Sequence, residues 1–411
     1  MRKLSLSVLV DFIFRKTNIK IFVKSIFHPS LLRVILRDLF RIKYNRYSDK
    51  DHLAGAMEWL CMSQDMTGCG GCSATYSFER GWTLPYPETT GYIISTFLKY
   101  STLTGKSTYI ERARQMGDWE IDIQLPTGAV RGGSGINDYP IVFNTGMVIL
   151  GWSDLYEFTK DTRYLDAAIR AADWLCSIID PDGKWSRFTY NEIPHAYHSR
   201  VAWSLLEVYK HTANTVYKDV ARKNLNWVLS LVQRNGWIEE MGFYKGEIPL
   251  THTIVYTLRG LLESSAYFEE ELRLKIFQVV VTASEKLMLK YELNKRHPNA
   301  TPGYFPGRIN SKWQPMANFT CLTGDAQMAI VWIKIYELNQ DARFLNSAIK
   351  MLDQIKELQD LNSKNNGLKG GIRGSYPIWG NYMPYSYPNW AAKFFADALI
   401  LQGEVINKLE R

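Results

Sequence analysis

The chain repeats one unit six times: a segment with a helical apolar stripe, a long loop rich in Gly and aromatic residues, and a second helical segment that begins at a polar residue. The second segments begin, in chain order, at Glu88, Asn144, His198, His252, Asp325 and Asn389. The first four of these positions are about 55 residues apart, and such regular spacing indicates a repeat architecture. Longer gaps before the last two indicate loop insertions.

Four of the first segments carry a tryptophan, and these tryptophans recur at about the same spacing as the polar residues at which the second segments begin. These residues are Trp59 (AMEWLCMSQ), Trp119 (MGDWEIDIQ), Trp174 (AADWLCSII) and Trp227 (LNWVLSLVQ). We expect them to pack between neighbouring helical hairpins, because large aromatic side chains contribute most of their free energy through burial. With 411 residues, of which 46% are hydrophobic, the chain has enough material for one large helical domain.

The connections between segments alternate in length. Short polar turns such as TGKS, TKDT and LNQD follow the second segments, whereas long loops follow the first segments. This asymmetry predicts that all long loops lie on one face of the molecule. Loops of that length inside a compact domain are usually functional, so we expect the site there.

Six segments of each type, from residues 51–64 to residues 389–405, predict a closed ring. Together with the WLCMSQ and RNGW strings, this arrangement resembles the six-hairpin (α/α)6 toroid superfamily of carbohydrate-active enzymes. The resemblance implies an all-α toroid over residues 49–411, in which the second segments form the inner ring and the long loops wall a cleft over their N-termini. Fold alone does not give the reaction.

Residues 1–48 differ in composition and are predicted to form a basic amphipathic arm. Residues 1–46 contain eleven Lys and Arg residues but only two acids, whereas the rest of the chain is close to neutral. The arm suits an anionic membrane surface or a biosynthetic partner, and the neutral body predicts no nucleic-acid partner. No secretory signal or membrane-spanning run is recognisable. We therefore expect a cytoplasmic protein, peripheral at the inner face of the membrane and connected with surface-polysaccharide biosynthesis.

The five cysteines are odd in number and irregular in spacing, which favours a reducing compartment over a disulfide framework. The CGGC string at residues 69–72 lacks a second ligand pair, so we predict a tight turn and no metal site. No nucleotide-binding motif is present either, because GGSG at residues 132–135 has no phosphate-binding context. The sequence therefore predicts no cofactor.

The candidate chemistry lies where the inner segments begin. Unpaired amides and the helix dipole favour negative charge there, so an anionic substrate or a developing oxyanion would be stabilised. The predicted catalytic residues are Glu88, Asn144, His198, His252, Tyr256 and Asp325. Tyr256 follows His252 by one helical turn, so both side chains can point into the pore.

The long loops add arginines and aromatic residues that suit an acidic sugar. Arginine binds carboxylates through two parallel hydrogen bonds, and aromatic rings stack on sugar rings. The predicted substrate-binding residues are Arg80, Trp82, Arg131, His195, Arg200, Arg259, Tyr304, Arg308, Arg373, Trp379 and Asn389.

The favoured function is cleavage of an acidic, uronate-containing polysaccharide or oligosaccharide by β-elimination. The resemblance to toroidal uronate lyases implies that Asn144 neutralises the carboxylate, that His198 or His252 (or His195) acts as base, and that Tyr256 acts as base or leaving-group acid. Arg200 and Arg259 would supply positive charge. An imidazole suits this role because its ordinary pKa is close to neutral pH.

Three alternatives stay open at this point. A glycoside hydrolase would use two carboxyl groups, with Glu88 and Asp325 as the best pair. A sugar epimerase, such as a uronyl C5-epimerase, would use His198 and His252 as opposed acid and base. A toroid that only binds glycan would need none of this chemistry.

Overall fold

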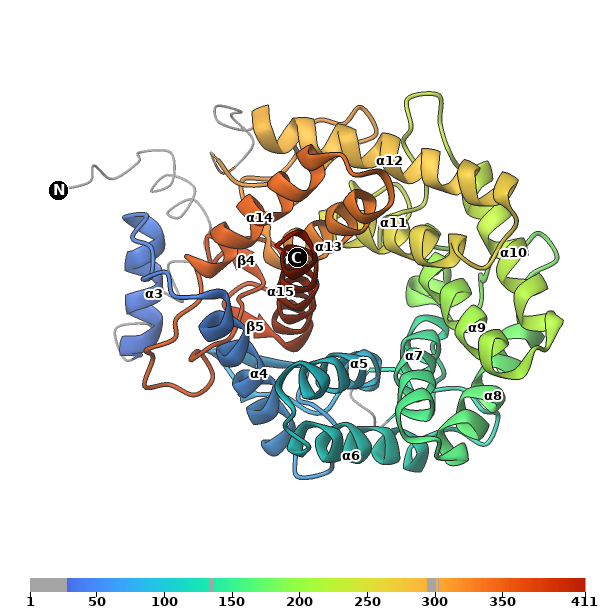
Figure 1. Ribbon diagram of the computed structural model, residues 1–411. Coiled ribbons are helices and arrows are strands. Elements are labelled where there is room, and N and C mark those ends of the chain that lie inside the picture. Colours follow the sequence, from blue (N-terminus) through green and yellow to red (C-terminus); the bar gives the residue numbers. More distant parts are fainter. Residues whose placement is uncertain (1–27, 134–136, 294–300, 302, 411) are drawn as a thin grey trace.

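The computed structural model describes residues 28–133, 137–293, 301 and 303–410. Within these residues, outer and inner helices alternate around a ring (Figure 1). The outer helices are α4 (Asp49–Asp65), α6 (Thr108–Asp122), α8 (Thr162–Ser177), α10 (Thr215–Ser230), α12 (Glu270–Leu293) and α14 (Ala342–Lys356). The inner helices are α5 (Pro87–Thr104), α7 (Val142–Thr159), α9 (Ser199–Thr212), α11 (Thr251–Ser265), α13 (Leu322–Asn339) and α15 (Asn389–Leu409). The predicted (α/α)6 toroid is confirmed.

The ring closes where the last inner helix meets the first hairpin. Helix α15 packs against both α4 and α5. On the long-loop side, strand β1 (Thr75–Ser77) pairs antiparallel with β2 (Gly81–Trp82) and with β5 (Ser386–Pro388). A second small sheet pairs β3 (Thr320–Cys321) with β4 (Ser375–Tyr376). Short 3-10 turns, η1 (Tyr190–Glu192) and η2 (Ala196–His198), precede α9.

Small residues let neighbouring inner helices approach closely. A Cβ atom added at Gly91 of α5 would lie 2.5 Å from Cα of Val148 in α7. One added at Gly151 of α7 would lie 2.1 Å from the carbonyl oxygen of Gly91. Glycine is therefore required at both positions, and the α5–α7 spacing follows from the sequence.

The outer helices begin at recognisable caps and bury one face. Asp161, Asn214 and Asp341 each accept a hydrogen bond from a backbone amide in the first turn of α8, α10 and α14. The periodic tryptophans pack as predicted. Trp59, Trp119 and Trp174 are buried, and Trp227 is partly buried against the same core.

The end of the predicted arm is a helix, α3 (Pro29–Leu39), packed on the outside of the ring. Its buried side includes Asp38, whose carboxylate accepts two hydrogen bonds of 2.7 Å from the Arg373 guanidinium. The backbone amide of Ile378 also donates to Asp38, at 2.7 Å. This part of the arm is therefore joined to the toroid, while residues 1–27 lie outside the described residues.

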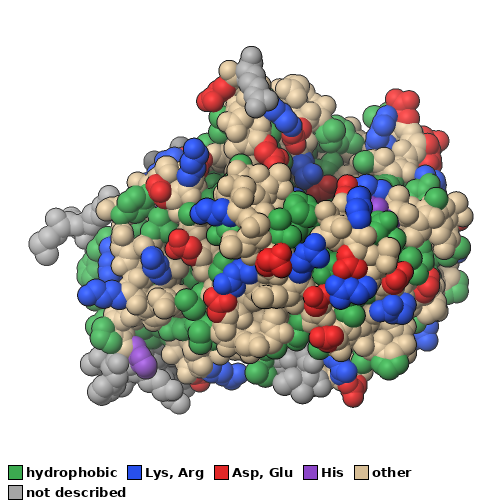
Figure 2. Space-filling model, turned by 60° about the horizontal axis from the view of Figure 1, so that its bottom comes forward, with side chains coloured by type: hydrophobic (Ala, Val, Ile, Leu, Met, Phe, Trp, Pro, Cys, Tyr) green, Lys and Arg blue, Asp and Glu red, His purple; other side chains and the backbone are tan. Residues whose placement is uncertain are grey.

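The charges of the toroid body are mixed rather than segregated. Over the face seen in Figure 2, Lys and Arg side chains alternate with Asp and Glu side chains. This distribution agrees with the near-neutral composition of the chain after residue 46. Among the described residues, no helix combines the length and apolar character needed to cross a bilayer.

Candidate active site

We use the word pore for the centre of the inner ring, where side chains of the inner helices recur every three or four residues. In α11 these are His252, Tyr256, Arg259 and Glu263, a spacing that places them on one helix face. Helix α5 presents Glu88 near its first turn. Since α5 and α11 are three positions apart in a ring of six, they face each other across the pore (Figure 1).

Glu88 is the carboxyl group at the rim of this pore. The hydroxyl of Tyr86 donates a hydrogen bond of 2.6 Å to Glu88 Oε2. Burial raises the pKa of Glu88 to about 7, and the opposing effects of the Tyr86 hydrogen bond and the Arg200 charge only partly offset it. A carboxyl group with this pKa can give or take a proton near neutral pH.

His252 is held in one orientation by the next inner helix. Nε2 of Gln327 in α13 donates a hydrogen bond of 2.9 Å to Nδ1 of His252. Because Nδ1 accepts this bond, the proton of the neutral imidazole is on Nε2. Burial, assisted by the nearby Arg200 charge, lowers the pKa of His252 to about 3. The ring is therefore a neutral hydrogen-bond donor at Nε2, and the predicted role as base is revised.

Tyr256 lies between His252 and a buried cation. Its ring centroid is 4.3 Å from that of His252, and the Arg200 guanidinium carbon is 4.7 Å from the Tyr256 centroid. Phe143 of α7 packs against the same ring at 5.1 Å. Burial raises the pKa of the Tyr256 hydroxyl, so the phenol is protonated at neutral pH and can act as a proton donor.

Two buried arginines supply positive charge beneath this group. Arg200 and Arg259 each place the guanidinium carbon 5.7 Å from the ring centroid of Trp203. Nε of Arg259 donates to Glu263 at 3.3 Å. Within the described part of the chain, Nε and Nη1 of Arg200 have no hydrogen-bond partner. Unmatched guanidinium donors at a buried position favour an anionic ligand.

The six polar openings do not occupy equivalent positions, which corrects the alignment of the repeat. The hydroxyl of Thr90 accepts a hydrogen bond from the Cys72 amide at 2.9 Å, and Thr145 does the same for Val130 at 3.0 Å. Thr90 and Thr145 are therefore the true equivalents. Glu88 lies two residues before Thr90, and Phe143 lies two residues before Thr145, so Phe143 is the α7 counterpart of Glu88.

Asn144 is consequently rotated away from the predicted position. Its side-chain amide donates a hydrogen bond of 3.0 Å to the carbonyl of Arg131. This amide supports the loop after α6, and we no longer assign it to carboxylate neutralisation.

The two histidines at the start of α9 are buried in the wall. His195 contacts the carbonyls of Gly242 and Tyr190 through its two ring nitrogens, at 2.9 and 2.7 Å, so both are committed to the loop backbone. His198 lies among aromatic rings, including Trp185 at 6.0 Å, and burial lowers its pKa well below the ordinary value. The ring of Phe143 contacts both His198 and Tyr256, so one aromatic ring connects His198 to the His252 and Tyr256 pair.

Asp325 does not pair with Glu88. Its Oδ2 accepts a hydrogen bond of 2.7 Å from Thr320, and burial raises its pKa well above the ordinary value. Its charge acts on Tyr291 of the outer helix α12, whereas Glu88 interacts with Tyr86 and Arg200. Asp325 and Glu88 therefore have different hydrogen-bond partners.

The predicted ring of loop arginines is used mainly for structural pairing. Arg131 pairs with Asp138 and donates to the carbonyl of Ile123 at 2.9 Å. Arg308 pairs with Glu247 at 2.7 Å. Arg373 is buried against Asp38.

The guanidinium groups of these three residues thus already have acidic partners. Arg80 remains exposed on its loop.

The remaining predicted substrate contacts also have structural roles. Trp82 packs on Trp59 with ring centroids 5.0 Å apart. The ring of Tyr304 lies under the Lys43 ammonium, and Trp379 is fully buried. Asn389 donates hydrogen bonds of 2.9 Å to the Ser73 carbonyl and to Thr89, which helps to close the ring.

Phe143, Gln327 and Tyr382 are near His252 and Tyr256 but were not predicted from the sequence. Tyr382 contacts His252 with a centroid distance of 5.4 Å. Phe143 and Gln327 could have been found by extending the helical spacing along α7 and α13. Tyr382 lies in an irregular loop segment, where the sequence offers no periodic signal.

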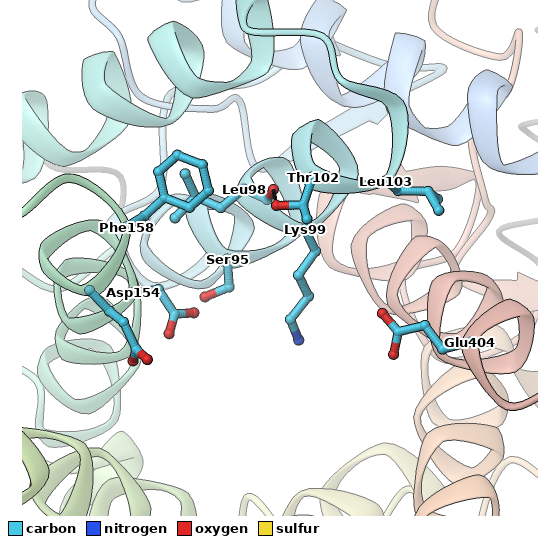
Figure 3. Close-up of a pocket in the computed structure, with 9 residues that line it drawn as sticks. Ser95, Leu98, Lys99, Thr102, Leu103, Asp154, Phe158 and Glu404 are labelled. Atoms are coloured by element: carbon cyan, nitrogen blue, oxygen red, sulfur yellow. Dashed lines mark hydrogen bonds between the residues drawn. The ribbon is translucent and has the colours of Figure 1, made fainter. Parts of the chain in front are cut away.

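The opposite mouth of the pore forms a separate cavity of about 460 Å³ at the C-terminal ends of α5, α7 and α15. In Figure 3, Ser95, Lys99, Asp154 and Glu404 point toward the open centre of the ring. Because Glu88 and His252 are at the N-terminal ends of their helices, this cavity is distinct from the candidate active site.

No metal centre is formed within the described ranges. Clusters of three or more His, Cys, Asp or Glu side chains with suitable placement are absent there. All five cysteines are free thiols. In the CGGC turn, Gly71 packs so closely on Trp119 that an added Cβ atom would lie 2.6 Å from the indole, which accounts for that glycine.

Comparison with known proteins supports the fold, and the matched proteins act on carbohydrates by different reactions. A family model for the β-L-arabinofuranosidase GH127 catalytic domain matches residues 136–239. No curated protein matches the sequence significantly.

Solved structures match over most of their length. An unsaturated glucuronyl hydrolase specific for heparin has 13% identity and a TM-score of 0.68, covering 87% of this chain and 98% of that chain. A sugar epimerase from a ruminal bacterium has 13% identity and a TM-score of 0.65, with 84% and 98% covered. A polysaccharide lyase has 14% identity and a TM-score of 0.61, with 88% and 99% covered. The chain thus has the (α/α)6 toroid fold of carbohydrate-active enzymes.

Proposed function

We propose that this (α/α)6 toroid is a carbohydrate-active enzyme that cleaves an acidic saccharide by β-elimination at the N-terminal end of the inner ring. The observation that carries the proposal is the placement of Glu88 opposite the His252 and Tyr256 pair, above the buried Arg200. One wall of the pore then offers a proton acceptor, and the other offers a proton donor and a hydrogen-bond donor.

The reaction proceeds by proton transfer between these walls. The ionised Glu88 carboxylate accepts the proton from C5 of the uronate. The electron pair left behind forms the C4=C5 double bond, and the bond between C4 and the glycosidic oxygen breaks. Tyr256 donates its hydroxyl proton to that leaving oxygen, and the proton held by Glu88 later returns to Tyr256 through water.

The negative charge that develops on the uronate carboxylate needs stabilisation during this step. The Nε2 proton of His252 and the guanidinium of Arg200 supply it from fixed positions in a buried pore. Such donors accelerate the reaction because they bind the developing charge more tightly than the ground state.

A uronyl C5-epimerase is the second candidate, favoured by one observation. Glu88 and Tyr256 come from opposite walls, so one could remove the C5 proton and the other return a proton on the other face. Hydrolysis by paired carboxyl groups has less support, since Asp325 accepts a hydrogen bond from Thr320 whereas Glu88 accepts one from Tyr86. A toroid that only binds glycan would need no proton transfer, so the pKa of about 7 at Glu88 would serve no function.

The test is to incubate the full chain with uronate-containing and neutral polysaccharides in deuterated water. Three signals are followed: ultraviolet absorbance of the new conjugated double bond, reducing ends, and deuterium at C5. We expect absorbance and reducing ends to rise together, and only with the uronate polymers.

Other outcomes contradict the proposal in distinguishable ways. Reducing ends without absorbance indicate a hydrolase. Deuterium at C5 with neither of the other signals indicates an epimerase. Saturable binding with no signal, over a panel of uronate polymers, indicates a glycan-binding protein.

A further inference from the structure

Helix α3 has a second apolar stripe that the toroid does not cover. One side of the helix is buried against the body through Leu31, Val34, Ile35 and Leu39. The opposite side carries Leu32, Leu36 and Phe40, which recur every four residues and so share one helix face. We call this face the outer stripe of α3.

The outer stripe is open to solvent in the described structure. Leu36 is 39% exposed, Phe40 is 40% exposed, and Ile42, just beyond the helix, is 47% exposed. Neighbouring large apolar residues at this exposure indicate an interaction surface, because isolated exposed side chains are the normal case on a soluble protein.

Basic side chains border the outer stripe. Arg33 is exposed beside Leu36, and Arg37 lies one turn further on, with its guanidinium 4.2 Å from the Tyr44 ring. At the left edge of Figure 2, where α3 lies, hydrophobic and basic side chains are seen together. An apolar stripe flanked by arginines matches the chemistry of an anionic bilayer surface.

We propose that the outer stripe of α3 docks the toroid onto an anionic lipid bilayer. Apolar side chains would enter the headgroup boundary while the arginines contact lipid phosphates. The preceding sequence has the same chemistry, with LSVLV and IKIFVKSIF interspersed with Lys and Arg.

Charge argues for a lipid rather than a second copy of the chain. Residues 1–46 have eleven basic and two acidic residues, so pairing two copies through this face would bring like charges together. The docking helix is also rigidly held, because the buried Asp38 and Arg373 pair fixes α3 to the body. Membrane binding would therefore orient the whole toroid.

The experiment is co-sedimentation of the full-length chain with vesicles. Phosphatidylcholine vesicles are compared with vesicles that also contain phosphatidylglycerol, at low and high salt. The test variant is Leu36→Ser with Phe40→Ser. The control is Leu274→Ser with Leu338→Ser, which removes two leucines on α12 and α13 that are 55% and 63% exposed and so more exposed than the tested residues.

We expect binding to the anionic vesicles only, weakened by salt, at least tenfold weaker in the test variant and unchanged in the control. Thermal unfolding confirms that both variants fold. Equal binding to neutral vesicles, or an unaltered test variant, would overturn the proposal. So would a dimeric wild type that becomes monomeric in the test variant, since the stripe would then join two copies.

Discussion

At the scale of single residues, the proposed reaction depends on the ionisation of Glu88. If Glu88 is the base, it must be ionised, so kcat/KM should rise with pH through about 7 and then level off. If it were the acid, kcat/KM would fall above that pH. The measurement is a pH profile of the absorbance assay, with Glu239→Gln, an exposed acid in a long loop, as the variant expected to keep the profile.

The same pKa predicts a change in stability with pH. A carboxyl group whose folded pKa is raised above its unfolded value favours folding only while protonated. The contribution of Glu88 is therefore lost as pH rises from 4.5, the ordinary pKa of a glutamate, through about 7.

At pH 8 we expect the free energy of unfolding of Glu88→Gln to exceed that of wild type by on the order of 1 to 3 kcal/mol, with a higher unfolding temperature. At pH 4 the two proteins should differ little. Thermal melts at both values measure this. An equal difference at the two pH values would contradict it.

His252 depends on Gln327 for its tautomer. Gln327→Leu removes the donor to Nδ1, so the Nε2 proton is no longer fixed. We expect kcat to fall about tenfold or more with a smaller change in KM, because the donor acts chiefly on the transition state. Gln278→Leu, on the exposed side of α12, is the control. A change in KM alone would assign Gln327 to substrate binding.

At the scale of secondary-structure elements, the sequence predicted each hairpin but not the rotation of each inner helix. One residue of misalignment turns a side chain by about 100 degrees, which is how Asn144 was assigned to the pore in place of Phe143. The pairing of His252 with Tyr256 was predictable because both are on one helix. The partners of Arg308 and Arg373 were not, since these contacts join segments distant in sequence.

The contact between α5 and α7 gives a prediction about stability. Gly151→Ala would place a Cβ atom 2.1 Å from a backbone oxygen, so we expect a loss of about 1 to 3 kcal/mol or more in the free energy of unfolding. Gly403→Ala in α15 meets nothing within 4 Å and should be neutral or stabilising. Denaturant titrations measure both, and equal effects would disprove the close approach.

At the scale of the whole molecule, helix α3 and the ring form one folded unit. Asp38→Asn leaves Arg373 buried without a charged partner, which typically costs about 3 to 5 kcal/mol. The exposed pair between Arg46 and Asp353 provides the control, because Arg46→Ala should cost about 1 kcal/mol or less. If Asp38→Asn unfolded like Arg46→Ala in thermal melts, α3 would not be part of the unit.

Closure of the ring also determines which residues meet at the candidate site. Closure brings α5 opposite α11, so residues far apart in sequence share one pore. The most direct test is the rate of double-bond formation on a uronate polymer by wild type, Glu88→Gln and Glu239→Gln. We expect Glu88→Gln to lose about 10²-fold or more and Glu239→Gln to match wild type. A wild-type rate in Glu88→Gln would contradict the assignment of this site.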